Sequence, residues 1–259
     1  MSLLIVLKNG EGQEIASCEA VHSAQMAIER AYLPGDCFEV SGADHLMVQM
    51  DQCLTQGEIY TPSGCFTYRI PFGSERTAYS PFAFEGERHI IRVREMEKEE
   101  RMAERAISSN PHDLRGNTDF YPHATANVET RGEADFAARN VIDGLSVNHS
   151  HGSWPYGSWG IGTKQDAALT IDFGRPVRAS RVRVLLRADF PHDSWWESCD
   201  LVFSDGSKEH MHLEKTDTFQ DIPVDKTISW IRMENLRKAD DPSPFPSLRQ
   251  LEVIGRDIL

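Results

Sequence analysis

The feature that most constrains the fold is a series of short apolar segments in the second half of the chain. From about residue 120 onward, segments of about five to eight residues alternate with turn residues. These segments are ALTIDFG, RVRVLLR, CDLVFSD, EHMHLE, TFQDIPV, SWIRMEN and LRQLEVIG. Short strands at this spacing are typical of an all-β sandwich. We therefore expect antiparallel sheets, with functional residues in the loops that connect them.

The first 94 residues predict a β-rich unit that contains one helix. The start, MSLLIVLKNG, has the composition of a strand that ends in a turn. Residues 19–31 have apolar side chains at helical spacing, at Val21, Ala24, Ile28 and Ala31. The later segments HLMVQMD, GEIYT, CFTYRIPF and RHIIRVR return to the alternation of a strand.

A short charged segment separates the two β-rich parts. Residues 95–107, EMEKEERMAERAI, predict a helix, and SSNPHDLRGN then ends it. A chain of 259 residues is long enough for two small domains. We predict a β-rich domain at 1–94, a helical connector at 95–114 and a second domain at 115–259. The expected fold class is all-β, with two β-sandwich or jelly-roll domains joined by a short helix.

Composition excludes several classes of partner. The formal net charge is −13, and basic residues form no cluster of five or more, so neither nucleic acid nor an anionic membrane is expected to bind. No apolar run is long enough to span a bilayer, and the first residues lack the features of a signal peptide. Five cysteines occur without a CxxC pair, which predicts reduced thiols. The sequence therefore predicts a cytoplasmic protein.

Aromatic residues concentrate in three loops of the second half. If successive strands reverse direction, HSHGSWPYGSW, ADFPHDSWWES and NLRKADDPSPFPS all lie at one end of the sandwich. This end collects the predicted ligand-binding side chains, which are His149, His151, Trp154, Tyr156, Arg187, His192, Asp193, Trp195, Asp240, Asp241 and Phe245.

The chemistry of these side chains suits a saccharide. Aromatic rings stack on the C–H faces of sugars, and Arg, His and Asp form directional hydrogen bonds with hydroxyl groups. An alternative is that the rings form a small core under the loops, and Trp159 and Trp196 fit this second interpretation. His149 and His151 form an H-x-H pattern that could hold a metal ion together with His192 or Asp193. A second H-x-H pattern, at His210 and His212, lies in an expected strand and indicates a face exposed to solvent.

The order of four segments resembles a known fold. ATANVETRGEADFAARNVIDG, LTIDFGRPVRASRVRVLL, LVFSDGS and LRQLEVIG together resemble the galactose-binding-like β-sandwich. This is the fold of the discoidin (coagulation factor V/VIII type C) family and of many carbohydrate-binding modules. The resemblance covers about 115–257 and implies non-catalytic binding of a saccharide. The chain departs from the family by lacking its cysteine pair and by having a longer, more aromatic loop after residues 142–144.

The same resemblance implies a structural calcium ion. In the family, an aspartate of the "DG" loop and a glutamate of the last strand hold calcium together with backbone carbonyls, and the matching residues here are Asp143 and Glu252. Calcium requires six to eight oxygen ligands, and the carbonyls of 144–148 could supply several. The alternative is that Asp143 stabilises its own turn and Glu252 is an ordinary strand residue.

Catalysis has little support in the sequence. It contains no GxSxG, HExxH, P-loop or GxGxxG motif, so we assign no catalytic residue. One alternative to binding is a carbohydrate-active hydrolase or a metal-dependent enzyme that uses the acidic and histidine residues of the loops. Its candidate carboxylates are Asp189, Asp193, Glu197, Asp240 and Asp241. Another alternative is an assembly protein whose aromatic end is the interface of a homo-oligomer.

Overall fold

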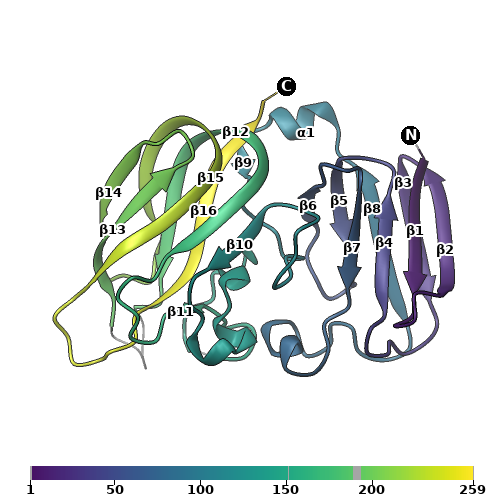
Figure 1. Cartoon of the computed structure of the whole chain (residues 1–259), viewed down its shortest axis with the longest axis horizontal. Coiled ribbons are helices and arrows are strands. Elements are labelled where there is room, and N and C mark those ends of the chain that lie inside the picture. The colour runs from purple at the N-terminus through teal and green to yellow at the C-terminus, as the bar shows by residue number, and fades with distance from the viewer. Residues whose placement is uncertain (1, 151, 189–193, 259) are drawn as a thin grey trace.

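The computed structural model describes residues 2–150, 152–188 and 194–258, and its regular structure is almost entirely β. Figure 1 shows the first half of the chain as one stack of strands on the right and the second half as another on the left. Short 3-10 helices and loops lie between the two stacks, in the lower part of the view. The all-β fold predicted from the sequence is confirmed.

The first half contains two four-stranded antiparallel sheets. The order in one sheet is β2 (Glu14–Val21), β1 (Ser2–Lys8), β4 (Cys37–Ser41) and β7 (Cys65–Arg69). The order in the other is β3 (Ser23–Ile28), β8 (His89–Glu95), β5 (His45–Gln49) and β6 (Gly57–Tyr60). Alternate side chains of both sheets, such as Leu3, Phe38 and Val48, are completely buried in one apolar cluster. The two sheets therefore enclose a single core, as in a β-sandwich.

The helix predicted for residues 19–31 is wrong. This segment contains the end of β2 and all of β3, separated at His22, whose φ is +64°. Ala24, Met26 and Ile28 alternate into the core, while the residues between them are exposed. The apolar residues of the segment fit both a helical and a two-residue period, and burial against the neighbouring sheet selected the latter.

The second half contains one large antiparallel sheet and three short 3-10 helices, and a fourth 3-10 helix lies in the first half. The main order is β11 (Trp159–Gly160), β16 (Ser247–Asp257), β12 (Leu169–Leu186), β15 (Gln220–Lys238), β13 (Trp196–Phe203) and β14 (Lys208–His212). β10 (His123–Ala126) pairs with β12, and β9 (Arg105–Ala106) pairs with β16. The 3-10 helices are η1 (Gly73–Ala78, in the first half), η2 (Thr130–Gly132), η3 (Ala134–Phe136) and η4 (Ala138–Ile142).

Two long strands replace pairs of predicted short ones. ALTIDFG and RVRVLLR were expected to be separate strands with a reversal between them, but both belong to β12, and TFQDIPV and SWIRMEN both belong to β15. The register of β12 against β15 shifts between Asp172 and Val177, so β12 bends without reversing. Gly174 lies in this bend with a φ of +65°, and a Cβ there would be 2.3 Å from the Tyr121 ring. The bend therefore requires glycine.

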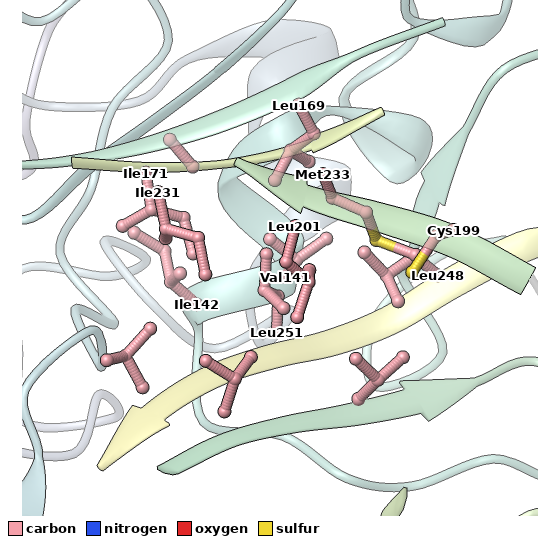
Figure 2. Packing of buried hydrophobic residues seen from close by; sticks show 14 of the residues in the cluster. Val141, Ile142, Leu169, Ile171, Cys199, Leu201, Ile231, Met233, Leu248 and Leu251 are labelled. Atoms are coloured by element: carbon pink, nitrogen blue, oxygen red, sulfur yellow. The ribbon is translucent and has the colours of Figure 1, made fainter. Parts of the chain in front are cut away.

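The core of the second half lies between the layers formed by this bent sheet. Figure 2 shows Leu169 and Ile171 of β12 beside Ile231 and Met233 of β15, across the core from Leu251 of β16. All five side chains are completely buried. The alternation of buried and exposed residues along these strands follows directly from the sequence pattern.

The connector between the halves is less helical than predicted. The expected helix at 95–107 is reduced to α1 (Lys98–Met102), after which the chain forms β9. α1 begins with a capping box between Glu97 and Glu100. Further along, the Asp113 carboxylate accepts hydrogen bonds from His123 Nδ1 at 2.6 Å and from the Ala124 amide at 3.0 Å. The connector is thus bonded to the second half.

Two further sequence expectations bear on the chain as a whole. All five cysteines lie in the described part of the chain and are free thiols. Among the described residues, no helix has the length and apolarity needed to cross a membrane.

A buried cluster of charges joins the two halves. Arg175 of β12 donates to Glu58 of β6 at 2.6 Å and to Asp257 of β16 at 2.7 Å, and Arg105 forms two further bonds of 2.7 Å with Glu58. Burial alone would raise the pKa of Asp257, but the neighbouring guanidinium groups, chiefly that of Arg175, hold this pKa below its usual value. All three of Arg175, Glu58 and Asp257 are less than a tenth exposed.

Replacing Arg175 is expected to destabilise the protein strongly. Arg175→Met removes a positive charge that neutralises the buried carboxylates of Glu58 and Asp257. Removing one partner of a buried ion pair costs about 3–5 kcal/mol of the free energy of unfolding. The measurement is the free energy of unfolding in a denaturant titration. The matched control is Arg178→Met, whose partner is Asp225 on the surface and whose loss should cost at most about 1 kcal/mol. Equal effects of the two changes would contradict the structural role given to Arg175.

Candidate functional site

A hollow of about 970 Å³ lies at one end of the second half. We call it the loop-end cavity. It is lined by residues 161–165, 196–198, 235–238, 241–244, His210, His212 and Pro246. These segments come from three strands and two loops, so the site depends on the rigid sheet for its floor and on loops for its rim.

Neighbouring strands place polar side chains side by side on the floor of this cavity. Cys199 and Leu201 of β13 point into the core, so Ser198 and Asp200 lie on the opposite face of the sheet. Ser198 pairs with His212 of β14 and with Arg237 of β15 in the strand register. The alternation along three strands therefore brings polar groups together from positions far apart in the sequence.

Asp200 organises the side chains next to the floor. Its carboxylate accepts hydrogen bonds from His210 Nδ1 at 2.8 Å, from Lys208 Nζ at 3.0 Å and from Asn235 Nδ2 at 3.0 Å. These bonds, of which that from His210 is the most important, lower the pKa of Asp200 to about 2. Asp200 is therefore ionised at neutral pH and holds the three donors in place.

The rim is a loop that is held by its own polar contacts. Lys238 Nζ contacts Asp241 Oδ1 at 3.1 Å and donates to the carbonyl oxygens of Ala239 and Asp241. Asp241 Oδ1 also accepts from the Ser243 amide at 3.0 Å. Three prolines at 242, 244 and 246 add apolar surface to the same rim. The rim is therefore pre-formed, which reduces the entropy lost when a ligand binds.

Two of the predicted loop tryptophans are core residues. Trp159 and Trp196 are completely or almost completely buried, and their ring centroids are 6.3 Å apart. The small-core interpretation is therefore correct for this pair, although Trp196 also lines the loop-end cavity from below. Trp195 is half-buried and packs against the same core. Its carbonyl accepts from the Ala239 amide at 3.0 Å, which joins its loop to the rim.

The loop around Trp154 lies elsewhere. The Trp154 amide donates to the carbonyl of Thr77 in η1 at 2.9 Å, and the Tyr156 carbonyl accepts from Arg187 Nη1 at 3.1 Å. Arg187 is 1% exposed, so it supports this loop from inside and presents no surface to a ligand. Trp154 is 37% exposed and His149 is exposed, but neither they nor Tyr156 line the loop-end cavity. Among the described residues, the loop around Trp154 therefore does not share the lining of the loop-end cavity.

The remaining predicted residues divide into three groups. His151, His192 and Asp193 lie outside the described residues, as does the carboxylate candidate Asp189. Asp240 is exposed and is not part of the loop-end cavity lining, whereas Asp241 belongs to that lining. Phe245 is 48% exposed and lines a second cavity of about 550 Å³. The two cavities share Ile161, Gly162 and Pro246, so Phe245 lies next to the larger one.

Sequence reasoning missed most of the cavity lining. The missed polar residues include Lys164, Gln165, His210, His212, Asn235, Arg237 and Lys238, whereas Glu197 had been named only as a candidate carboxylate. Most of them lie in strands, where polar outward-facing residues look like ordinary solvated positions. The one available signal was the H-x-H pattern of His210 and His212, which places both rings on the same face of a strand.

The two residues proposed for calcium have separate partners in the structure. Asp143 contacts the Arg249 guanidinium at 3.3 Å and accepts from Gln250 Nε2 and from the Leu145 amide, each at 2.8 Å. The hydrogen bond from the Leu145 amide closes a turn at Asp143 itself, as the alternative interpretation of this residue expected. Glu252 pairs with Arg183 at 3.0 Å. Calcium at these residues stays a prediction, and an ion there would share Asp143 with Arg249.

A different group of potential metal ligands occurs between the halves. His45, Glu58 and Asp257 bring ligand atoms within 4.8 Å of one another. Arg175 and Arg105 already bind the two carboxylates, and burial lowers the pKa of His45 to about 4. Because guanidinium groups neutralise the carboxylates, this group is a structural ion cluster and a poor cation site.

Comparison with known proteins gives similarity to solved structures alone. No family model matches the chain, and no curated protein matches its sequence. The chitosan-binding module 1 of a chitosanase/glucanase from Paenibacillus sp. IK-5 is 17% identical, with a TM-score of 0.38, covering 58% of this chain and 99% of that module. The family 32 carbohydrate-binding module of NanJ from C. perfringens, in complex with galactose, is 17% identical, with a TM-score of 0.39, covering 51% and 91%.

A third structure extends the same group. A fucose-binding module from Streptococcus pneumoniae is 13% identical, with a TM-score of 0.41, covering 60% of this chain and 96% of that module. The similarity to carbohydrate-binding modules of the galactose-binding-like fold, expected from the sequence, is thus found among solved structures as well.

The calcium prediction is tested by thermal unfolding. An ion bound only to the folded state raises the melting temperature, so excess chelator should lower it if Asp143 and Glu252 hold calcium. The measurement is a melting curve in calcium and in EDTA, for the unchanged chain and for Glu252→Gln. Glu252→Gln should remove the difference between the two curves. A melting temperature that does not respond to EDTA in the unchanged chain would contradict the calcium site.

Proposed function

We propose that the second half of the chain binds a saccharide, without chemical turnover, in the loop-end cavity. The observation that carries this proposal is the composition of the cavity wall. It combines donors, acceptors and apolar surface in one open hollow: Arg237 and Asn235 lie on the floor, Lys238 and Asp241 on the rim, and prolines between them. Small-molecule sites commonly combine an apolar wall with a few converging polar groups.

The side chains match the chemistry of sugar hydroxyl groups. Each hydroxyl both donates and accepts, so a saccharide needs donors and acceptors side by side. Arg237 supplies donors, Glu197 and Asp241 supply acceptors, and His212 supplies either. The volume of about 970 Å³ is at the upper end of the range of about 300–1,000 Å³ for ligand pockets, which leaves space for more than one sugar ring.

Phe245 supports the same proposal from the adjacent cavity. Nearly half of its ring is exposed, and a large exposed aromatic ring beside polar groups offers a stacking surface for the C–H face of a sugar. Arg131 lies over the half-buried ring of Phe136 at 5.3 Å in the same cavity. A ligand that extends across Pro246 would contact both hollows, so Phe245 remains a ligand-binding candidate.

Hydrolysis is the second candidate function, because two carboxylates line the loop-end cavity. Glu197 contacts Arg237 at 3.4 Å, and Asp241 contacts Lys238 at 3.1 Å. A glycosidase needs two carboxyl groups free to flank the bond that is cleaved, whereas each of these two is engaged by a neighbouring cation. The structure therefore favours binding over cleavage. Release of a shorter product from a bound oligosaccharide would reverse this preference.

Arg237→Ala is expected to weaken saccharide binding with little effect on stability. The Arg237 side chain is 77% exposed, so its removal leaves the core intact. A lost hydrogen bond to a charged group costs about 1.5–3 kcal/mol, which corresponds to a dissociation constant raised about 10–100-fold. The measurement is a glycan array that includes chitosan, galactose and fucose oligosaccharides, followed by calorimetry with the best ligand.

Arg256→Ala is the matched control. Arg256 is also exposed on a strand, but it lies nine residues beyond Ser247 along β16, which is about 30 Å from the rim. Its replacement should leave the affinity unchanged. Equal affinities for all three proteins would place the binding site elsewhere, and the absence of binding to any glycan would contradict the proposed function.

A further inference from the structure

We propose that His210 and His212 form a binding site for one divalent transition-metal ion of the class Cu²⁺, Ni²⁺ or Zn²⁺. The two residues lie on the same face of β14, because side chains two apart on a strand share a face. Their ring centroids are 4.9 Å apart, and the ring planes meet at 86°. Imidazole nitrogen is a preferred ligand of these ions.

The separation of the rings fits a shared ion. Metal–nitrogen bonds of about 2.0–2.1 Å, plus roughly 1.1 Å from the nitrogen to the ring centre, place each ring centre about 3.2 Å from the ion. Two such rings at a ligand–metal–ligand angle of about 90–109° have centres about 4.5–5.2 Å apart. The observed 4.9 Å lies in this range, so the spacing of the two rings on the strand suits a shared ion.

Asp200 prepares His210 to act as a ligand. An ionised carboxylate only accepts hydrogen bonds, so the 2.8 Å contact places the proton of His210 on Nδ1. The Nε2 lone pair is then available for the metal. This is the arrangement found around metal-bound histidines, in which the second ring nitrogen donates to a carboxylate that fixes the tautomer and the orientation of the ring. Lys208 and Asn235 in turn hold the Asp200 carboxylate.

The position of the pair leaves it open to an ion. β14 is at the end of the main strand order, and the His210 side chain is half-exposed. β14 pairs with β13, which places Ser198 opposite His212 and Asp200 opposite His210. This pairing fixes the backbone of the two histidines. Among the described residues, no third His, Cys, Asp or Glu joins this pair in a group of ligand atoms, so water or a ligand oxygen from the loop-end cavity completes the coordination.

The test is direct titration of the full chain with NiCl2 at neutral pH, followed by calorimetry and by imidazole NMR signals. We expect one ion per chain at this site, with micromolar affinity because the protein supplies two ligands. His210→Ala and His212→Ala should each weaken binding at least tenfold. Asp200→Asn should weaken it by about tenfold or more, since partners of metal-bound histidines contribute about 10–100-fold. If the melting temperatures of the two histidine variants are unchanged, their weaker Ni²⁺ binding results from the lost imidazole groups and not from unfolding.

His149→Ala is the control, because His149 belongs to the other H-x-H pattern of the chain. It should leave Ni²⁺ binding at the β14 pair unchanged. The proposal is overturned if His149→Ala abolishes binding while His212→Ala does not. It is also overturned if half an ion binds per chain and the protein dimerises, since the ion then joins two chains. Saccharide binding is not needed for any of these results, so this inference and the proposed function can fail separately.

Discussion

The second half of the chain depends on the pairing of β12 with β15. These two strands are the longest in the protein, and β16, β13 and β10 each pair with one of them. Register shifts near Asp172 and Ala179 bend the pair, so the sheet that attaches to it closes around the core. The loop-end cavity is lined by β15 of this pair, by β13 and β14, and by residues 161–165 and the rim.

The sequence was sufficient for the class of fold and for much of the core, because both follow from local alternation. Leu169, Ile171, Ile231 and Met233 are buried as the period of two requires. The sequence pattern was insufficient where two expected strands form one continuous strand through a segment that resembles a turn. RPVRAS contains proline and arginine, as a surface turn does, yet the chain continues through it because Gly174 permits the bend and β16 pairs with the residues beyond. Residues 19–31 show the same limit, since pairing with β8 decided their structure.

The site was harder to predict for a different reason. The aromatic residues of the loops were expected to line one binding site. Trp159 and Trp196 are instead buried in the core, and the loop that contains Trp154 is hydrogen-bonded to η1. The polar floor is built from cross-strand neighbours such as Ser198 and Arg237, and such neighbours become visible only when the register is known. Asp241 and Phe245, which the sequence also indicated, belong to a proline-rich loop without a strand pattern, and they line the loop-end cavity and its neighbour respectively.

The ion cluster around Arg175 has a consequence for how the protein can be divided. Arg175 follows the glycine bend of β12 directly, and one of its two carboxylate partners belongs to the first half of the chain. A fragment that begins after the connector would keep Arg175 and Asp257 but lose Glu58, Arg105 and the Asp113 bonds to β10. The second half is therefore not a self-contained unit that can be moved to another protein by cutting at residue 115. Its neighbour is part of its scaffold, and an engineered fusion would need to carry both.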